Sequence, residues 1–452
     1  MRRPSTMLLL LGVALAGLVL AAVCLHVPGI PDHARVVRQN AIIAVMMVAA
    51  AVYFVAVRMV LRHAFGRATL WGIIGIAILL RAILLPIPPF LSDDLYRYVW
   101  DGRVQAAGIN PYRYIPADPA LTALRDQDVY PHINRRDYAR TIYPPAAQLV
   151  FAAVGEVWDS VTAMKLVMVG FEALGVVCLL QLLRLAGLPR ERVLIYAWNP
   201  LALWSAASDG HVDAFVVGLL GLALLLRARQ RDGWAGTVLA CATLVKFFPI
   251  VVAAAFVRGG RLWRPALAGV ATIVALYAVY SSAGSHVLGF LPSYESEEGL
   301  ADGSGFWLLS GLGAVVALPA WGVTLYLAIA AAAIAGLSLF VLYRRQRVGS
   351  NDVTILCRDT AMLAAAATVA VSPHYAWYFS WLTVPAVVAP SRPVLWLSVV
   401  PLILYIDPWP HEHFLWRGLI YLPAAALLAI DLVRRRVLTP DSTSTTVCSS
   451  QT

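Results

Sequence analysis

Charged residues are scarce in this chain. Asp, Glu, Lys and Arg make up 13% of its 452 residues, and 60% of the residues are hydrophobic. The mean hydropathy is +0.74. A soluble domain typically has about 25% charged and about 45–50% apolar residues. The composition therefore excludes an ordinary soluble enzyme and predicts an all-α, polytopic integral membrane protein.

Cysteines are also few. The chain has five, and none forms a CxxC motif or a Cys/His pair: Cys24, Cys178, Cys241, Cys357 and Cys448. This scatter excludes a disulfide framework and gives no zinc site. The adjacent carboxylates Asp93 and Asp94 do not complete a set of metal ligands. We therefore expect no metal in the protein.

Phosphate-binding loops are missing too. The chain has no Walker A motif and no GxGxxG motif, so the usual backbone cradle for a nucleotide is absent from the sequence. ATP and nucleotide sugars are not available to an enzyme that works outside the cytoplasm. Its substrate would have to arrive already activated on a membrane carrier, and we expect no separate cofactor.

Basic residues exceed acidic ones by 35 to 25, and they lie in short clusters between apolar runs. The clusters are Arg2–Arg3, Arg58/Arg62/Arg67, Arg184/Arg190/Arg192, Arg227/Arg229/Arg231, Arg258/Arg261/Arg264, Arg344/Arg345/Arg347 and Arg434–Arg436. Clusters of this kind mark cytoplasmic loops. The net charge of +10 therefore reflects membrane topology, and no soluble segment is large enough for a nucleic-acid-binding module.

The apolar runs predict about 11–14 transmembrane helices, since a span needs about 20 apolar residues. The first run resembles a secretory signal but is too long for one, so we expect an uncleaved helix. Spans are predicted near residues 7–27, 40–60, 69–89, 161–184, 192–207, 211–228, 265–282, 321–343, 356–372, 377–390, 393–407 and 415–433. Residues 143–158 are short for a span, and 233–257 are predicted as two half-spans broken at Lys246–Pro249.

This topology places the polar loops on one side of the membrane. Residues 90–142, 208–213, 284–304, 373–375 and 407–413 are expected outside, and the arginine clusters inside. Residues 1–437 are predicted to form a single transmembrane domain, with 90–142 as its large first extracytoplasmic loop. The polar tail 438–452 is predicted to be disordered and cytoplasmic. The expected location is the plasma membrane, with the protein crossing it many times.

The first large loop begins with the stretch SDDLYRYVWDG (residues 92–102), which carries three aspartates. Asp93 and Asp94 could simply cap a helix after Ser92. Asp101 is expected to be structural, either solvated or paired with an arginine. The alternative is that one aspartate is a general base at the membrane surface.

Four further residues are candidates for a site on the same side. His211 and Asp213 lie in the predicted loop 208–213, and His374 follows the span 356–372. Lys246 lies in the middle of the membrane, far from either cytoplasmic end, where an ionisable group is a functional hypothesis by default. It could also extend its ammonium group toward the interface. His374 could equally belong to an interfacial aromatic belt.

Several motifs follow one another over residues 92–381. They are Asp94-Leu95-Tyr96-Arg97-Tyr98 with Gly102, Gly108 and Asn110-Pro111-Tyr112; Tyr143-Pro144-Pro145-Ala146; Asn199-Pro200-Leu201 with Asp209-Gly210-His211-Val212-Asp213-Ala214; Leu244-Val245-Lys246 with Pro249; and Ser372-Pro373-His374-Tyr375 with Trp377. Because these motifs occur in this order, the chain resembles the polyprenyl-phosphate-mannose-dependent mannosyltransferases of the GT-C superfamily. It is most similar to the bacterial lipomannan α-mannosyltransferases.

The resemblance implies a GT-C-like fold and a catalytic aspartate in the first large loop. Asp94 matches that position, and Asp93 stands where the family often has arginine, so Asp93 is a possible supporting acid. The family serine is Arg97 here, and the asparagine of its G-H-N-D motif is Val212. These two departures concern the sugar and the acceptor, not the reaction type. Residues 113–142 match no motif of the family.

The resemblance also suggests roles for the remaining candidates. Arg97, His211, Asp213, Lys246 and His374 are expected to bind the donor phosphate or the sugar. Tyr143, Pro144 and Pro145 are expected to shape the loop.

The sequence thus predicts a membrane glycosyltransferase that moves a hexose, with mannose first, from a polyprenyl-phosphate donor to a glycolipid or cell-envelope glycan. Its partners would be this lipid-linked sugar, the glycan acceptor and membrane lipid, with no nucleic acid. The alternatives are a flippase for a lipid-linked saccharide, or an outward-facing glycan ligase or polymerase. A flippase would show internal repeats, and the chain has no convincing repeat.

Overall fold

The computed structural model describes residues 2–26, 32–257, 263–348, 352–406 and 413–438. The predicted tail 438–452, except for its first residue, and most of the predicted loop 407–413 lie outside the described residues. All regular elements in the described part are helices, so the prediction of an all-α fold is confirmed.

The first half of the chain contains the elements α1 (Arg2–Cys24), α2 (Asp32–Arg62), α3 (Arg67–Leu84), α4 (Asp94–Ala106), η1 (Pro119–Leu124), η2 (Tyr130–His132), α5 (Pro145–Trp158), α6 (Val161–Leu185), η3 (Arg190–Val193), α7 (Leu194–Ala197), α8 (Pro200–Leu203), η4 (Trp204–Ser208) and α9 (Asp213–Ala228). The second half contains α10 (Asp232–Thr243), η5 (Phe248–Phe256), α11 (Trp263–Val279), η6 (Ser281–Leu288), α12 (Leu291–Glu297), α13 (Trp307–Gly313), α14 (Gly322–Val348), α15 (Val353–Val371), η7 (Ala376–Leu382), α16 (Thr383–Val388), α17 (Arg392–Leu397), η8 (Val400–Tyr405) and α18 (His413–Leu438).

Seven helices in the described residues are long and apolar enough to cross a membrane, and two bent helix pairs bring the number to nine. The prediction of a polytopic membrane protein is therefore confirmed. The number is smaller than the 11–14 expected, because several apolar runs form short helices. The run predicted as a span at 192–207 is divided into α7, α8 and η4. The run at 377–390 forms η7 and α16, and the run at 393–407 forms α17 and η8.

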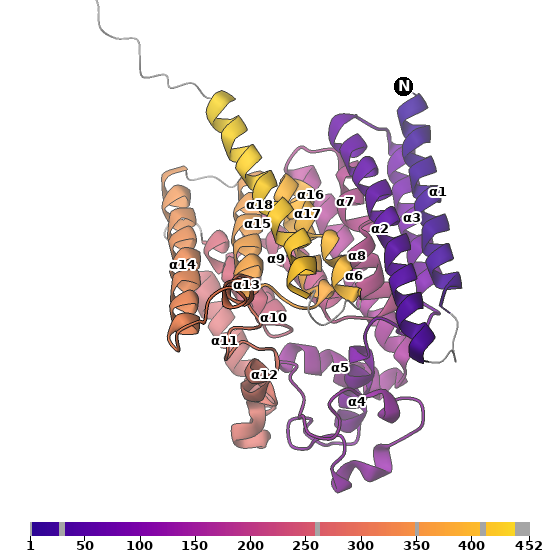
Figure 1. Ribbon diagram of the computed structural model, residues 1–452, viewed down its shortest axis with the longest axis vertical. Helices are drawn as coiled ribbons and strands as arrows, with labels where there is room; N and C mark the ends of the chain where they lie inside the picture. Colours follow the sequence, from indigo (N-terminus) through magenta and orange to yellow (C-terminus); the bar gives the residue numbers. More distant parts are fainter. Residues whose placement is uncertain (1, 27–31, 258–262, 349–351, 407–412, 439–452) are drawn as a thin grey trace, which may run out of the picture.

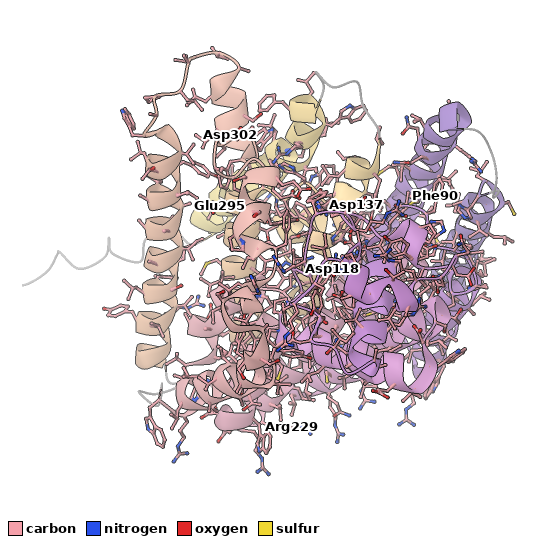
Figure 2. The ribbon with its side chains drawn as sticks, turned by 90° about the horizontal axis from the view of Figure 1, so that it is seen from below. Phe90, Asp118, Asp137, Arg229, Glu295 and Asp302 are labelled. Atoms are coloured by element: carbon pink, nitrogen blue, oxygen red, sulfur yellow. The ribbon has the colours of Figure 1, made fainter. Side chains whose placement is uncertain are left out.

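The molecule has two distinct ends. The N-terminus and the end of α18 lie at one end, and α4, α5 and α12 lie at the other (Figure 1). Figure 2 looks onto this second end, where Asp118, Asp137, Glu295 and Asp302 lie on the polar segments that follow α4 and α11. We call this the loop end of the molecule.

Proline-containing motifs fix where α8 and α5 begin. Asn199 accepts a hydrogen bond from the backbone N–H of Ala202, and Pro200 occupies the first position of α8. Pro145 takes the same first position in α5, after Pro144. Proline is tolerated there because the first turn of a helix leaves its N–H groups without intrahelical partners. The Asn-Pro and Pro-Pro motifs therefore act as helix starts.

Candidate active site

A cavity of about 480 Å³ opens among residues from both halves of the chain. Its volume lies within the range of about 300–1,000 Å³ that is common for small-molecule sites. Its polar lining comprises Ser92, Asp94, Tyr98, Asn134, Arg135, Tyr143, Lys246, Tyr294, Glu298, His374, Tyr375 and Tyr378. Of the residues predicted from sequence, Asp94, Tyr143, Pro144, Lys246 and His374 line this cavity.

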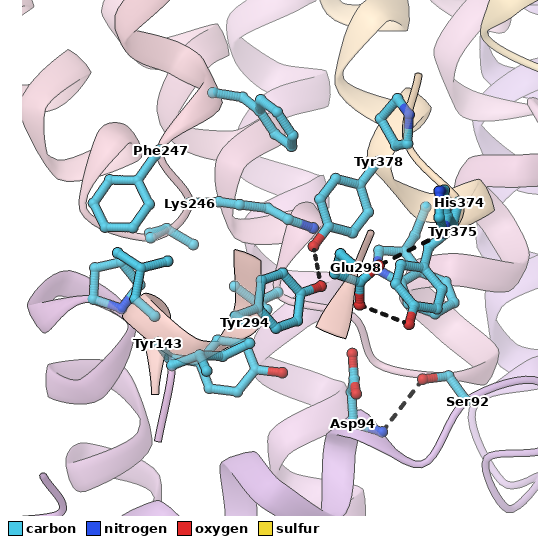
Figure 3. Close-up of a pocket in the computed structure, with 18 of the residues that line it drawn as sticks. Ser92, Asp94, Tyr143, Lys246, Phe247, Tyr294, Glu298, His374, Tyr375 and Tyr378 are labelled. Carbon is cyan, nitrogen blue, oxygen red and sulfur yellow. Dashed lines mark hydrogen bonds and ion pairs between the residues drawn. The ribbon is translucent and has the colours of Figure 1, made fainter. Parts of the chain in front are cut away.

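Asp94 is the first residue of α4, and its side chain points into the cavity (Figure 3). The positive end of a helix dipole favours a carboxylate at this position. Oδ1 of Asp94 accepts a hydrogen bond of 2.7 Å from Nδ2 of Asn134. Burial raises the pKa of Asp94 above its ordinary value, while the bond from Asn134 and the nearby Lys246 act in the opposite direction. A carboxylate with a raised pKa is a better proton acceptor, which suits a general base.

Two buried charges hold the loop that leads into α4. Oδ1 of Asp209 accepts hydrogen bonds from the backbone N–H groups of Phe90 and Leu91. Nζ of Lys165 donates to the carbonyl oxygens of Leu84 and Ile87, at 3.2 and 2.6 Å. The loop between α3 and α4 is therefore fixed at both ends, and Asp94 follows it directly.

His211 lies beside Asp94. Its Nδ1 is 3.8 Å from Oδ2 of Asp94, too far for a hydrogen bond. The imidazole is fully buried and stacks on Trp377 with ring centroids 3.9 Å apart. Neither ring nitrogen has a hydrogen-bond partner among the described residues. Gly210 enables this turn, because its φ of +63° lies in the left-handed region that favours glycine.

Lys246 lies in the break between α10 and η5, as the predicted half-spans suggested. Its Nζ contacts both carboxylate oxygens of Asp213, at 2.9 and 2.7 Å. It also lies 3.4 Å from the ring centroid of Tyr378, in a cation–π contact. The neighbouring Val245, Phe247 and Phe248 give this end of the cavity an apolar lining.

Five of the predicted site residues do not line the cavity: His211 and Asp213 lie beside the lining residues Asp94 and Lys246, and three others lie elsewhere. Arg97 is buried in α4 and binds Asp101 at 2.9 Å, so the structure does not place it at the cavity. Its partner Asp101 also accepts a hydrogen bond from Gln148, which agrees with a structural role. Asp93 is exposed just before α4 and is absent from the lining. Pro145 begins α5 behind Pro144.

Sequence reasoning missed several residues of the cavity. Asn134 and Arg135 come from the segment that matches no family motif, and Tyr294 and Glu298 come from the second polar loop. The sequence did predict that loops 90–142 and 284–304 lie on the same side of the membrane, and these loops contain all four residues. No group of three or more His, Cys, Asp or Glu side chains in the described part of the chain could hold a metal ion. The expected absence of a metal stays a prediction.

The chain was compared with known protein families, with curated proteins and with solved structures. A model of the family described as alpha-(1->6)-mannopyranosyltransferase, N-terminal domain, matches residues 5–259. No curated protein matches the chain, and no solved structure does. The matched segment includes Asp94, Asn134, His211 and Lys246 but ends before Glu298. It covers more than half of the chain and confirms the resemblance drawn from the motifs, so the protein belongs to this mannosyltransferase family.

Proposed function

We propose that the protein transfers a mannose residue from a polyprenyl-phosphate donor to a glycan acceptor at the outer face of the plasma membrane. The observation that carries this proposal is the cavity shared by Asp94 and Lys246, in a member of a mannosyltransferase family. The family description suggests an α-(1→6) linkage, and an acceptor that already carries mannose is the natural choice.

Asp94 is the proposed general base. Its carboxylate takes the proton of the attacking hydroxyl group while the acceptor oxygen bonds to the anomeric carbon. The bond between that carbon and the phosphate oxygen breaks at the same time, and the electron pair leaves with the polyprenyl phosphate. A single displacement of this kind inverts the anomeric centre and needs only one base.

Lys246 is the proposed contact for the donor phosphate. Its ammonium group has three donors, and Asp213 accepts from two of them. The cation can therefore still approach an anionic oxygen and stabilise the charge that develops on the leaving group. Phe247 and Phe248 beside it suit the apolar chain of a lipid carrier. His211 is fully buried beside Asp94 and does not line the cavity, so its proposed role is to position Asp94.

The direct test is a transfer assay on the purified protein in detergent or nanodiscs. The donor is polyprenyl-phosphate mannose labelled in the sugar, and the acceptor is an α-(1→6)-linked mannotriose. We expect a labelled tetrasaccharide that forms only when both the protein and the mannotriose acceptor are present. Movement of the labelled lipid across the bilayer of vesicles, without any labelled tetrasaccharide, would instead support a flippase.

A further inference from the structure

A cluster of polar side chains lines the cavity away from Lys246 (Figure 3). Glu298 lies at its centre, just after α12, and its Oε1 accepts a hydrogen bond of 3.0 Å from the hydroxyl of Tyr375. Nη2 of Arg135 lies 3.6 Å from the same oxygen. Nδ1 of His374 lies 3.8 Å from the other oxygen of Glu298. Three segments that are far apart in sequence thus meet around one carboxylate.

The charges of this cluster do not favour a phosphate. Arg135 lies between two carboxylates, because its Nε is also 2.6 Å from Oε1 of Glu297. A guanidinium whose positive charge is already neutralised by two carboxylates attracts a third anion only weakly. Lys246, in contrast, faces the single carboxylate of Asp213. The cluster around Glu298 therefore suits an uncharged ligand that is rich in hydroxyl groups.

The hydrogen-bonding capacity of Glu298 fits such a ligand. A carboxylate offers about four lone-pair positions, and Tyr375 takes one of them. The side chain of Glu298 is 11% exposed, so the surrounding protein fixes its position. It still lines the cavity and is therefore accessible to a ligand there. Charge-assisted bonds from ligand hydroxyls to this carboxylate would be strong.

Aromatic rings line this part of the cavity and extend from it to Lys246, which contacts the ring of Tyr378. Tyr375 stacks on Trp377 with ring centroids 4.8 Å apart, and the hydroxyls of Tyr294 and Tyr378 lie 3.3 Å from each other. All four rings line the cavity. Flat aromatic surfaces with polar edges can bind a pyranose ring, whose faces are apolar and whose rim carries hydroxyls.

We propose that Glu298, Arg135, His374 and Tyr375 form the subsite that binds the acceptor glycan. The inference rests on the proposed function, because it divides that one cavity into a donor end at Lys246 and an acceptor end at Glu298. Asp94 connects the two ends. Asn134 binds Asp94, and the next residue, Arg135, contacts Glu298, so the base lies beside the subsite from which a hydroxyl would attack.

The test compares Glu298→Gln with Glu297→Gln. Both residues face Arg135, but Glu298 lines the cavity and Glu297 does not. We expect Glu298→Gln to raise the KM for α-(1→6)-mannotriose by about 10- to 100-fold, the value of a charge-assisted hydrogen bond. The KM for the polyprenyl-phosphate mannose donor should stay within about twofold. Glu297→Gln should leave both values within about twofold.

Two further measurements keep the test decisive. Tyr375→Phe removes one hydroxyl and should raise the acceptor KM by about 3- to 10-fold. This variant still tests the subsite if Glu298→Gln does not fold. The change in tryptophan fluorescence on adding mannotriose measures binding without any transfer.

If wild-type protein transfers mannose but Glu298→Gln binds mannotriose normally, the subsite is refuted. Equal effects of Glu297→Gln, or a raised donor KM, also refute it. If mannotriose binds in a Glu298-dependent way but no transfer occurs, the proposed function fails and the subsite stands.

Discussion

Asp93 and Asp94 are neighbours in sequence with different surroundings. Asp93 is exposed before the helix, whereas Asp94 points into the cavity, accepts a hydrogen bond from Asn134 and lies 3.8 Å from His211. The sequence alone could not separate them, because both lie at the start of the helix, just before its first buried residue, Leu95. The difference arises from contacts with residues about 40 and 117 positions further along the chain.

The hydrogen bond from Asn134 leads to a prediction about pH. It stabilises the charged form of Asp94 and therefore lowers its pKa, against the raising effect of burial. A general base works only when it is deprotonated, so activity should fall as the pH falls through this pKa. Asn134→Ala should move the acid limb of the kcat/KM profile to higher pH. An acid limb that stays in place or moves to lower pH would contradict the role of Asp94.

The pair of Lys246 and Asp213 leads to a second prediction. Lys246→Met leaves the buried Asp213 carboxylate without its cation, which typically costs about 3–5 kcal/mol. The Tm should therefore drop, and turnover should fall by about 100-fold or more because the leaving group loses its cation. The double variant Lys246→Met/Asp213→Asn separates the two effects. It should recover most of the Tm and none of the turnover, whereas recovery of both would make Lys246 purely structural.

At the scale of helices, α4 and α5 approach each other closely through two glycines. A Cβ added to Gly102 would lie 2.3 Å from the carbonyl oxygen of Phe151, and one added to Gly155 would lie 2.5 Å from the backbone of Gly102. The family motif includes Gly102, and the structure gives its physical reason. The close contact fixes the axis of α4, which carries Asp94 at its first position.

This contact can be tested by adding single methyl groups. We expect Gly102→Ala and Gly155→Ala to destabilise the protein by about 1–3 kcal/mol, because a packed backbone cannot move aside. Gly170→Ala on α6 is the matched control, since nothing lies within 4 Å of its added Cβ. It should leave the Tm unchanged or raise it, as alanine stabilises a helix relative to glycine. A Tm measured in detergent that falls equally in all three variants would contradict this packing.

Helix positions were easier to predict than helix breaks. The long apolar runs gave α1, α2, α3, α6, α14, α15 and α18 nearly where they lie. The break at Lys246 was also predicted, because a lysine and a proline interrupt the run. The breaks within 377–407 were not, since their apolar residues are equally compatible with a span, and packing against other helices decides the outcome. The cluster around Glu298 depends on contacts between distant segments and left no local pattern.

The whole molecule has a loop end, with α4, α5 and α12, and an opposite end, where α1 begins and α18 ends (Figure 1). Residues of α4 and α12 at the loop end line the cavity. α9 runs from Asp213 near the cavity over 16 residues, and at 1.5 Å per residue it ends about 24 Å away, next to Arg229. Clusters of arginine such as Arg227/Arg229/Arg231 favour the cytoplasmic side. The loop end is therefore expected to face outward.

Single cysteines can test this orientation in a variant whose native cysteines are replaced by serine. Asp137→Cys and Arg229→Cys change exposed residues, the first on the loop end (Figure 2) and the second at the end of α9 that lies away from Asp213. A membrane-impermeant maleimide should label Asp137→Cys in intact cells and Arg229→Cys only after the membrane is opened. The reverse pattern would place the cavity in the cytoplasm and overturn the choice of an outward-facing reaction.

The proposal depends most on Asp94, and its neighbour provides the control. We expect Asp94→Asn to reduce the rate of mannose transfer from labelled polyprenyl-phosphate mannose by about 100- to 10,000-fold, the usual contribution of a general base. Asp93→Asn should keep the rate within about threefold, and both variants should insert and purify like wild type. A rate for Asp94→Asn close to that of wild type, or a loss confined to Asp93→Asn, would contradict the assignment of Asp94 as the base.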